Sequence, residues 1–199
     1  MPSTTTKPIL VLASASPRRA ALLAQAGIVP AGIVSPEIDE AVKKGELPRG
    51  HAQRLSAEKA RAARARWTGG DAFILAADTV VGCGRRILPK AETDDDVRAC
   101  LELLAGRRHQ VLTAVSLSAP NGKLTTRVAL TRVSFRRLTA AEIGSYVDSR
   151  EGQGKAGGYA IQGRAECFVK EIAGAWSNVV GLPLAMTVGM LEGAGWRHG

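Results

Sequence analysis

Two adjacent arginines occupy the first turn of a predicted helix, in the motif LASASPRR at residues 12–19. An apolar run before the motif predicts a buried strand, and Ser16 and Pro17 suit the N-cap and the first helical position. A helix N-terminus carries partial positive charge, so Arg18 and Arg19 favour a bound anion that compensates them. Arginine binds phosphate through paired hydrogen bonds, which indicates a phosphate site; two solvated surface arginines are the alternative.

Asp78 directly follows the fully apolar segment 72–77, which predicts a buried strand. An ionised carboxylate there is costly unless it is paired, hydrogen-bonded or bound to metal. We place it at the carboxyl end of that strand, where α/β sheets tend to bind ligands. The alternative is a turn aspartate that accepts backbone N–H bonds.

Two further segments carry polar groups suited to a ligand. The glycine-rich segment GKAGGYAIQG at 154–163 lets the backbone approach a ligand closely, and Gln162 offers a donor and an acceptor for the edge of a base. Lys59 lies partly on the apolar side of a predicted helix at 51–67. For Lys59, the alternative is a stem that covers the core while the ammonium reaches solvent.

The charge balance favours an anionic partner. Lysine and arginine outnumber aspartate and glutamate by 27 to 18 among 199 residues, a net charge of +9. This balance favours nucleic acid or a phosphorylated small molecule. A nucleic-acid surface usually interleaves basic and aromatic residues, and aromatic residues make up only 4% of the chain, so we expect no nucleic-acid partner.

Other sequence signals limit the kinds of site that the chain could carry and indicate its cellular environment. The three histidines are isolated, which disfavours a transition-metal site, and the absence of a G-x-S-x-G motif disfavours a serine hydrolase. If a metal takes part, the carboxylates of Glu40 and Asp78 favour Mg²⁺ or Mn²⁺.

The three cysteines stand far apart, which predicts a reduced, cytoplasmic setting. No segment approaches the length of a membrane span, so we expect no membrane partner, and the polar residues 1–7 predict a disordered tail before a single domain at 8–199.

Helix signals and hairpin signals both occur along the chain. Thr93 and Thr139 are predicted N-caps, and Asn121-Gly122 is a predicted hairpin turn. The predicted strands are 9–12, 32–35, 72–77, 110–117, 124–135, 166–171 and 179–181, and the predicted helices are 17–27, 51–67, 93–106, 139–148 and 184–191. This mixture predicts an α/β fold with a mixed twisted sheet.

Five motifs together resemble those of the Maf (septum-formation-inhibitor) family of nucleoside triphosphate pyrophosphatases, roughly over residues 9–191. They are LASASPRR at 12–19, AEKA at 57–60, AADTVV at 76–81, KAGGYAIQG at 155–163 and VGLPL at 180–184. Each motif is modest alone, but five in this order are specific. The resemblance implies an elongated, two-lobed fold like that of inosine triphosphatases, with a central cleft, and often a homodimer.

The resemblance also implies a reaction and roles for particular residues. A nucleoside triphosphate is expected to be cleaved between its α and β phosphates, giving a monophosphate and pyrophosphate. Asp78 matches the family's proposed general base, and Glu40 matches an acidic residue near substrate and metal. Five further residues match its substrate-binding residues: Ser14, Arg18, Arg19, Lys59 and Lys90.

Three positions distinguish the family's branches. Arg18, Thr79 and Gln162 resemble the branch that acts on dTTP and UTP. Arg164 and Glu166 depart from the commoner small residues beside the specificity loop, so modified pyrimidine nucleotides stay open as substrates. The alternatives are a 7-methyl-GTP-type pyrophosphatase and a non-enzymatic regulator of septum formation that acts by binding.

Overall fold

A mixed, twisted sheet forms the centre of the computed structural model, which describes residues 8–197. Its seven strands include a parallel part and an antiparallel part. The main path runs in the order β2 (Gly32–Ile33), β1 (Ile9–Ala13), β3 (Ala72–Cys83), β6 (Arg108–Ser118), β7 (Leu124–Phe135) and β9 (Val169–Ala173). β1 is parallel to both of its neighbours, whereas the later pairs are antiparallel. The prediction of an α/β fold with a mixed sheet is confirmed.

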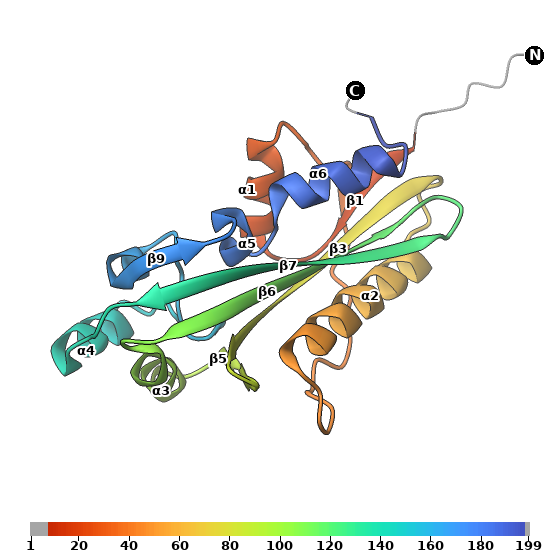
Figure 1. The fold of residues 1–199 in the computed structure, drawn as a ribbon. Coiled ribbons are helices and arrows are strands. Elements are labelled where there is room, and N and C mark those ends of the chain that lie inside the picture. The colour runs from red at the N-terminus through yellow and green to blue at the C-terminus, as the bar shows by residue number, and fades with distance from the viewer. Residues whose placement is uncertain (1–7, 198–199) are drawn as a thin grey trace, which may run out of the picture.

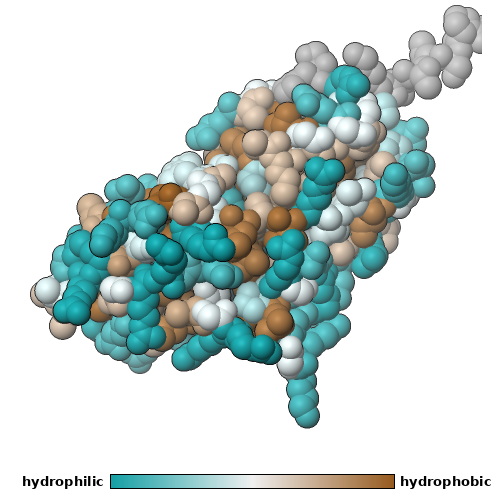
Figure 2. All heavy atoms as spheres, in the orientation of Figure 1, coloured by the Kyte–Doolittle hydropathy of each residue, from teal (hydrophilic) through white to brown (hydrophobic). Residues whose placement is uncertain are grey.

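The helices cover both faces of this sheet and give the molecule an elongated shape (Figure 1). α2 (Pro48–Arg66) lies on one face. The opposite face carries α1 (Pro17–Gln25), α5 (Trp176–Val180) and α6 (Leu184–Gly193). α3 (Asp94–Leu104) and α4 (Ala140–Asp148) lie together at one end of the molecule. Figure 2 shows hydrophilic side chains over much of one side of the molecule, with apolar surface exposed between them.

β3 is the strand that positions the site, and it is longer than the apolar run suggested. It continues through Asp78 to Cys83, so Asp78 lies within the strand and its predicted place at the strand's end is wrong. β1 instead ends beside β3, with Ala13 opposite Ala76, and β4 (Arg86–Leu88) joins the same edge only at Val81. Within residues 8–197, no strand pairs with this edge of β3 between those two points. Asp78 therefore lies beyond the carboxyl end of the parallel neighbour, where the sheet opens.

Successive residues of β3 face opposite sides of the sheet, as in any strand. Ile74 and Ala76 pack in one core cluster with Ala60 and Ala63 of α2. Leu75 and its odd-numbered neighbours pack in a larger cluster on the side of α1 and α6. Asp78 consequently faces α2, and Thr79 faces α1.

Two short segments differ from prediction. The predicted strand at 166–171 is a 3₁₀ helix, Arg164–Phe168, followed by β9, and the predicted strand at 179–181 lies in α5 and its C-cap. A short apolar run has the same appearance in a buried helix and in a buried strand, so hydrophobicity alone could not separate them. The predicted caps Thr93 and Thr139 are confirmed, because each accepts a bond from the N3 backbone N–H in a capping box.

The loop between α4 and the 3₁₀ helix contributes β8 (Lys155–Ala156), which pairs with β5 (Lys90–Ala91) from the segment before α3 in a two-stranded sheet. Gly157 follows β8 at φ +70°, and a Cβ atom there would meet Val81 Cγ1 at 2.9 Å. Glycine is thus required at this position both by backbone conformation and by packing. The close approach fixes the glycine-rich segment against β3.

Replacing Gly157 with Ala tests this packing. We expect Gly157→Ala to lose about 2–4 kcal/mol of unfolding free energy, from left-handed strain and from overpacking against Val81. Gly84→Ala is the matched control, because Gly84 has a similar φ of +61° but nothing within 4 Å of its added Cβ. The control should lose only about 1 kcal/mol. Equal losses in urea unfolding would show that packing at Gly157 contributes nothing.

Candidate active site

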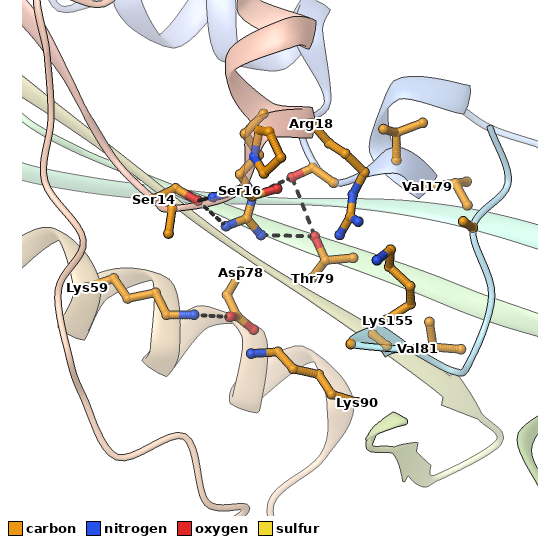
Figure 3. Close-up of a pocket in the computed structure, with 18 of the residues that line it drawn as sticks. Ser14, Ser16, Arg18, Lys59, Asp78, Thr79, Val81, Lys90, Lys155 and Val179 are labelled. Atoms are coloured by element: carbon orange, nitrogen blue, oxygen red, sulfur yellow. Dashed lines mark hydrogen bonds and ion pairs between the residues drawn. The ribbon is translucent and has the colours of Figure 1, made fainter. Parts of the chain in front are cut away.

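A cavity of about 340 Å³ opens between the end of β1, the start of α1, the middle of β3 and the glycine-rich loop. Lys59 reaches it from α2, and Val179 and Gly181 form a further wall. All nine residues that the sequence singled out line this one cavity: Ser14, Arg18, Arg19, Glu40, Lys59, Asp78, Thr79, Lys90 and Gln162. Segments far apart in the chain therefore converge here (Figure 3).

A row of alternating charges lies on the α2 side of the cavity. Lys59 Nζ is 2.6 Å from Asp78 Oδ1 and 2.7 Å from Glu40 Oε1. Lys59 and Asp78 are both buried, so each compensates a charge that would be costly alone. The alternative in which Lys59 extends to solvent is wrong, because its ammonium ends inside the site.

Lys90 extends this row, since its ammonium binds the other carboxylate oxygen of Glu40. Partial burial raises the pKa of Glu40, but hydrogen bonds from Lys59 and Lys90 outweigh it and lower the pKa to about 2. Glu40 is thus held ionised between two ammonium groups. The two lysines and two carboxylates of the row balance in formal charge.

On the side of β3 that faces α1, the guanidinium of Arg19 is bound only by uncharged oxygen atoms. Its guanidinium donates to Gly181 O at 3.0 Å, to Ser14 Oγ at 3.0 Å and to Thr79 Oγ1 at 3.4 Å. Burial has the largest effect on the pKa of Arg19 and lowers it. The nearby carboxylates of Asp78 and Glu40 raise this pKa, and the charge of Arg18 lowers it. No carboxylate forms an ion pair with Arg19 within residues 8–197, so its positive charge stays available to a ligand.

The start of α1 has the predicted helix but not the predicted cap. Ser16 occupies the N-cap position without a side-chain bond to the helix. Ser14 Oγ instead accepts a bond from Ser16 N–H at 3.2 Å, so Ser14 fixes the turn that leads into the arginines. Pro17 has no N–H, and the Arg19 N–H donates to Ser16 O at 3.2 Å, so within residues 8–197 the first turn leaves the N–H of Arg18 for an anion.

Lys155 is a site residue that we did not single out within the glycine-rich segment. It lines the cavity, and Figure 3 shows its side chain pointing toward Arg18. Burial first, and Arg18 second, lower the pKa of Lys155. The signal was present in the sequence, because a lysine within a run of glycines at a predicted ligand loop is itself a candidate for binding an anion.

Gln162 lies on a loop that buried hydrogen bonds hold in place. Tyr146 Oη accepts a bond from Ala160 N–H at 3.0 Å, and Tyr159 Oη is 2.8 Å from His109 Nε2. Burial lowers the pKa of His109 to about 4, so this histidine is neutral at pH 7. The Gln162 side chain itself is exposed at the cavity, where its amide is free to contact a ligand.

Glu40 and Asp78 are the two carboxylates of the cavity that could hold a metal ion. Residues 8–197 contain no group of three or more His, Cys, Asp or Glu side chains arranged for a metal. Two carboxylates nevertheless fit Mg²⁺, which usually takes one or two protein carboxylates and completes its shell with water and substrate phosphates. The donor set therefore suits a hard cation that binds together with a phosphorylated ligand.

The fold and the cavity define an α/β protein whose site places unpaired cations beside an ionised carboxylate pair, an arrangement suited to phosphate compounds. The chain belongs to the family described as Maf-like protein, whose model matches residues 9–194. In the part of the chain that the structure describes, no helix is both long enough and apolar enough to cross a membrane.

Similar proteins agree with the family assignment. A protein of Caulobacter vibrioides named dTTP/UTP pyrophosphatase is 54% identical over 96% of this chain and 97% of its own length. One of Paramagnetospirillum magneticum with the same name is 54% identical over 94% of this chain and 98% of its own. The Ham1 protein of Staphylococcus aureus has a TM-score of 0.42 at 16% identity, over 63% of this chain and 71% of its own.

Acid titration of stability tests the charge row. The pKa of Glu40 is lowered from 4.5 to about 2, so its ionised form stabilises the folded state above pH 4.5. That contribution is lost as the pH falls toward about 2. The melting temperature of Glu40→Gln should therefore fall less steeply than that of the wild type over this interval.

Glu102→Gln is the control for this titration, because Glu102 is an exposed residue of α3, outside the cavity lining. It should follow the wild-type curve. Parallel acid curves for Glu40→Gln and the wild type would show that Glu40 is not held ionised by the lysines.

Proposed function

We propose that this protein is a nucleoside triphosphate pyrophosphatase that hydrolyses dTTP and UTP to the monophosphate and pyrophosphate. One observation carries the proposal: residues of all five motifs, together with Glu40 and Lys90, line a single cavity with the charges that a triphosphate needs. The names of the full-length relatives support dTTP and UTP as the substrates. Modified pyrimidine nucleotides remain within the proposed range.

In the proposed mechanism, Asp78 accepts the proton of the attacking water. Its carboxylate is ion-paired with Lys59 and buried beside the phosphate-binding arginines, so a water bound to it would face the scissile phosphorus. Arg19 and Ser14, together with the first turn of α1, bind phosphate oxygens and stabilise the charge that develops on them. Arg18, Lys59 and Lys90 add positive charge around the triphosphate.

Glu40 and Asp78 would hold a divalent cation, Mg²⁺ or Mn²⁺, together with phosphate oxygens of the substrate. The bound ion would neutralise phosphate charge during cleavage. Lys59 contacts both carboxylates and would have to adjust as the cation binds.

The remaining predictions concern the setting of the enzyme. We propose a cytoplasmic location, on the basis of the three dispersed cysteines, all of which are free in the structure. A homodimer and a link to septum formation remain predictions that follow from the family. The 7-methyl-GTP-type activity and a purely binding role are less favoured, because the relatives share the other name.

Asp78→Asn tests the proposed base. The side chain is nearly isosteric but cannot accept the proton, so turnover of UTP with Mg²⁺ should fall by about 10²-fold or more. Pyrophosphate release is the measurement, with melting temperature and circular dichroism as evidence of folding. A folded variant with near-normal turnover would exclude Asp78 as the base, and a wild type that releases pyrophosphate equally well without divalent cation would exclude the proposed metal.

Gln162→Glu tests the proposed contact with the base. An amide can pair with both the O4 acceptor and the N3–H donor of uracil or thymine, whereas a carboxylate accepts only. The change should cost about 1–3 kcal/mol of transition-state stabilisation on UTP and dTTP, with a smaller loss on 7-methyl-GTP. Values of kcat/KM on the three nucleotides decide it, and an equal loss on all three would mean that Gln162 does not contact the base.

A further inference from the structure

Thr79 and Thr113 lie directly opposite each other on β3 and β6, and their hydroxyl oxygens are 2.9 Å apart. Thr79 lines the cavity, whereas Thr113 is fully buried behind it and is not part of the lining. Each hydroxyl has one proton and two lone pairs. The partners of Thr113 therefore decide which of the two threonines donates.

The proton of Thr113 is committed elsewhere. Thr113 Oγ1 donates to the backbone carbonyl of Asn178 at 3.0 Å, and a carbonyl can only accept. Asn178 is itself fixed, because its Nδ2 donates to Val111 O and to Thr131 Oγ1, each at 3.0 Å. Since Thr113 has no second proton, the hydrogen bond between the two hydroxyls must be donated by Thr79.

Gly181 O is the competing acceptor for the proton of Thr79, at 3.4 Å. That carbonyl already accepts from Arg19 Nε at 3.0 Å, and the contact with Thr113 is 0.5 Å shorter, the difference between 3.4 Å and 2.9 Å. The lone pairs of Thr79 are then what its hydroxyl presents to the cavity. One of them receives the guanidinium N–H of Arg19 at 3.4 Å, which leaves the other for a ligand.

We propose that Thr113 is a positioning residue that fixes the Thr79 hydroxyl as an acceptor, and that this acceptor selects the N3–H group of uracil or thymine while the Gln162 amide donates to O4. The inference rests on the proposed function and extends it to base selection. Cytosine has an unprotonated N3, which is also an acceptor, so CTP would bring two acceptors together. A mismatch of this kind leaves a buried polar group unpaired and is rejected strongly.

Thr113→Val keeps the shape of the side chain but removes the acceptor for the Thr79 proton. Thr79 can then rotate and donate, so it no longer distinguishes a donor from an acceptor at N3. The ratio of kcat/KM for UTP to that for CTP should fall by about tenfold, through a loss on UTP and a gain on CTP. Thr113→Ser, which retains the hydroxyl, should keep the wild-type ratio.

Thr131→Val is the matched control on β7. Thr131 is also a buried threonine bonded to the Asn178 side chain, and its hydroxyl donates to Ala175 O at 3.1 Å, but its hydroxyl forms no hydrogen bond with Thr79. A variant that only loosens this region would lower the melting temperature without changing the UTP to CTP ratio. We expect that result for Thr131→Val and not for Thr113→Val.

The outcomes separate this inference from the proposed function. A wild type that releases no pyrophosphate from UTP would overturn both. An active wild type with a Thr113→Val ratio that is unchanged, or that Thr131→Val changes as much, would overturn the role of Thr113 alone. 3-Methyluridine triphosphate is the second probe: it lacks the N3–H, and turnover by the wild type equal to that of UTP would overturn the proposed contact.

Discussion

The opening in the sheet beside β3 is the constraint on which the site depends. β1 ends opposite Ala76, and β4 pairs with β3 only from Val81 onward, so the backbone between these points has no strand neighbour on that edge within residues 8–197. A paired strand there would cover Asp78 and Thr79 with backbone, whereas the opening leaves them accessible to a ligand while β6 still holds the other edge. The turn into α1 starts where β1 ends, which brings its arginines to the same opening.

Because side chains alternate along β3, the site has two sides with different charge. Asp78 faces α2 and meets Lys59, and Thr79 faces α1 and meets Arg19. Charge is balanced on the first side and positive on the second, where Arg18, Arg19 and Lys155 have no carboxylate ion-pair partner within the described residues. The phosphates of the proposed substrate would supply the negative charge that the second side lacks, beside the two arginines and Lys155.

The sequence predicted those parts of the structure that depend on local signals. The apolar segment at 72–77, the helix after Pro17 and the caps Thr93 and Thr139 each follow from a short stretch of chain. The position of Asp78 within β3 did not, because the length of a strand depends on the partner that continues beside it. The helix at α5 was missed for a similar reason, since burial determines the structure of a short apolar run.

The site residues also divide into those that local sequence signals indicated and those whose role depends on the tertiary structure. Arg18, Arg19 and Asp78 were detectable from charge placed where charge is costly. Glu40 was named from the sequence alone only as a carboxylate suited to Mg²⁺ or Mn²⁺, and Lys90 entered only through the family resemblance. No local pattern indicated that Glu40, from an irregular segment, would bridge Lys59 and Lys90. The convergence of these three side chains is a property of tertiary structure. Thr113 and Asn178 carry no sequence signal at all, since a buried hydroxyl acquires its role only from its partners.

The presence of the buried Lys59–Asp78 pair is explained better by function than by the stability of the fold. Desolvating two opposite charges costs about as much as their attraction returns, and well-packed apolar residues in such positions are often as stable or more stable. The neighbouring residues of β3 on the same face are apolar and pack against alanines of α2, so an apolar pair at this point would continue the core. The chain instead places an ammonium and a carboxylate beside an open cavity. A charged pair at that position gives the folded state no stability that apolar packing could not supply, but it holds a carboxylate beside the cavity, where the proposed general base is required.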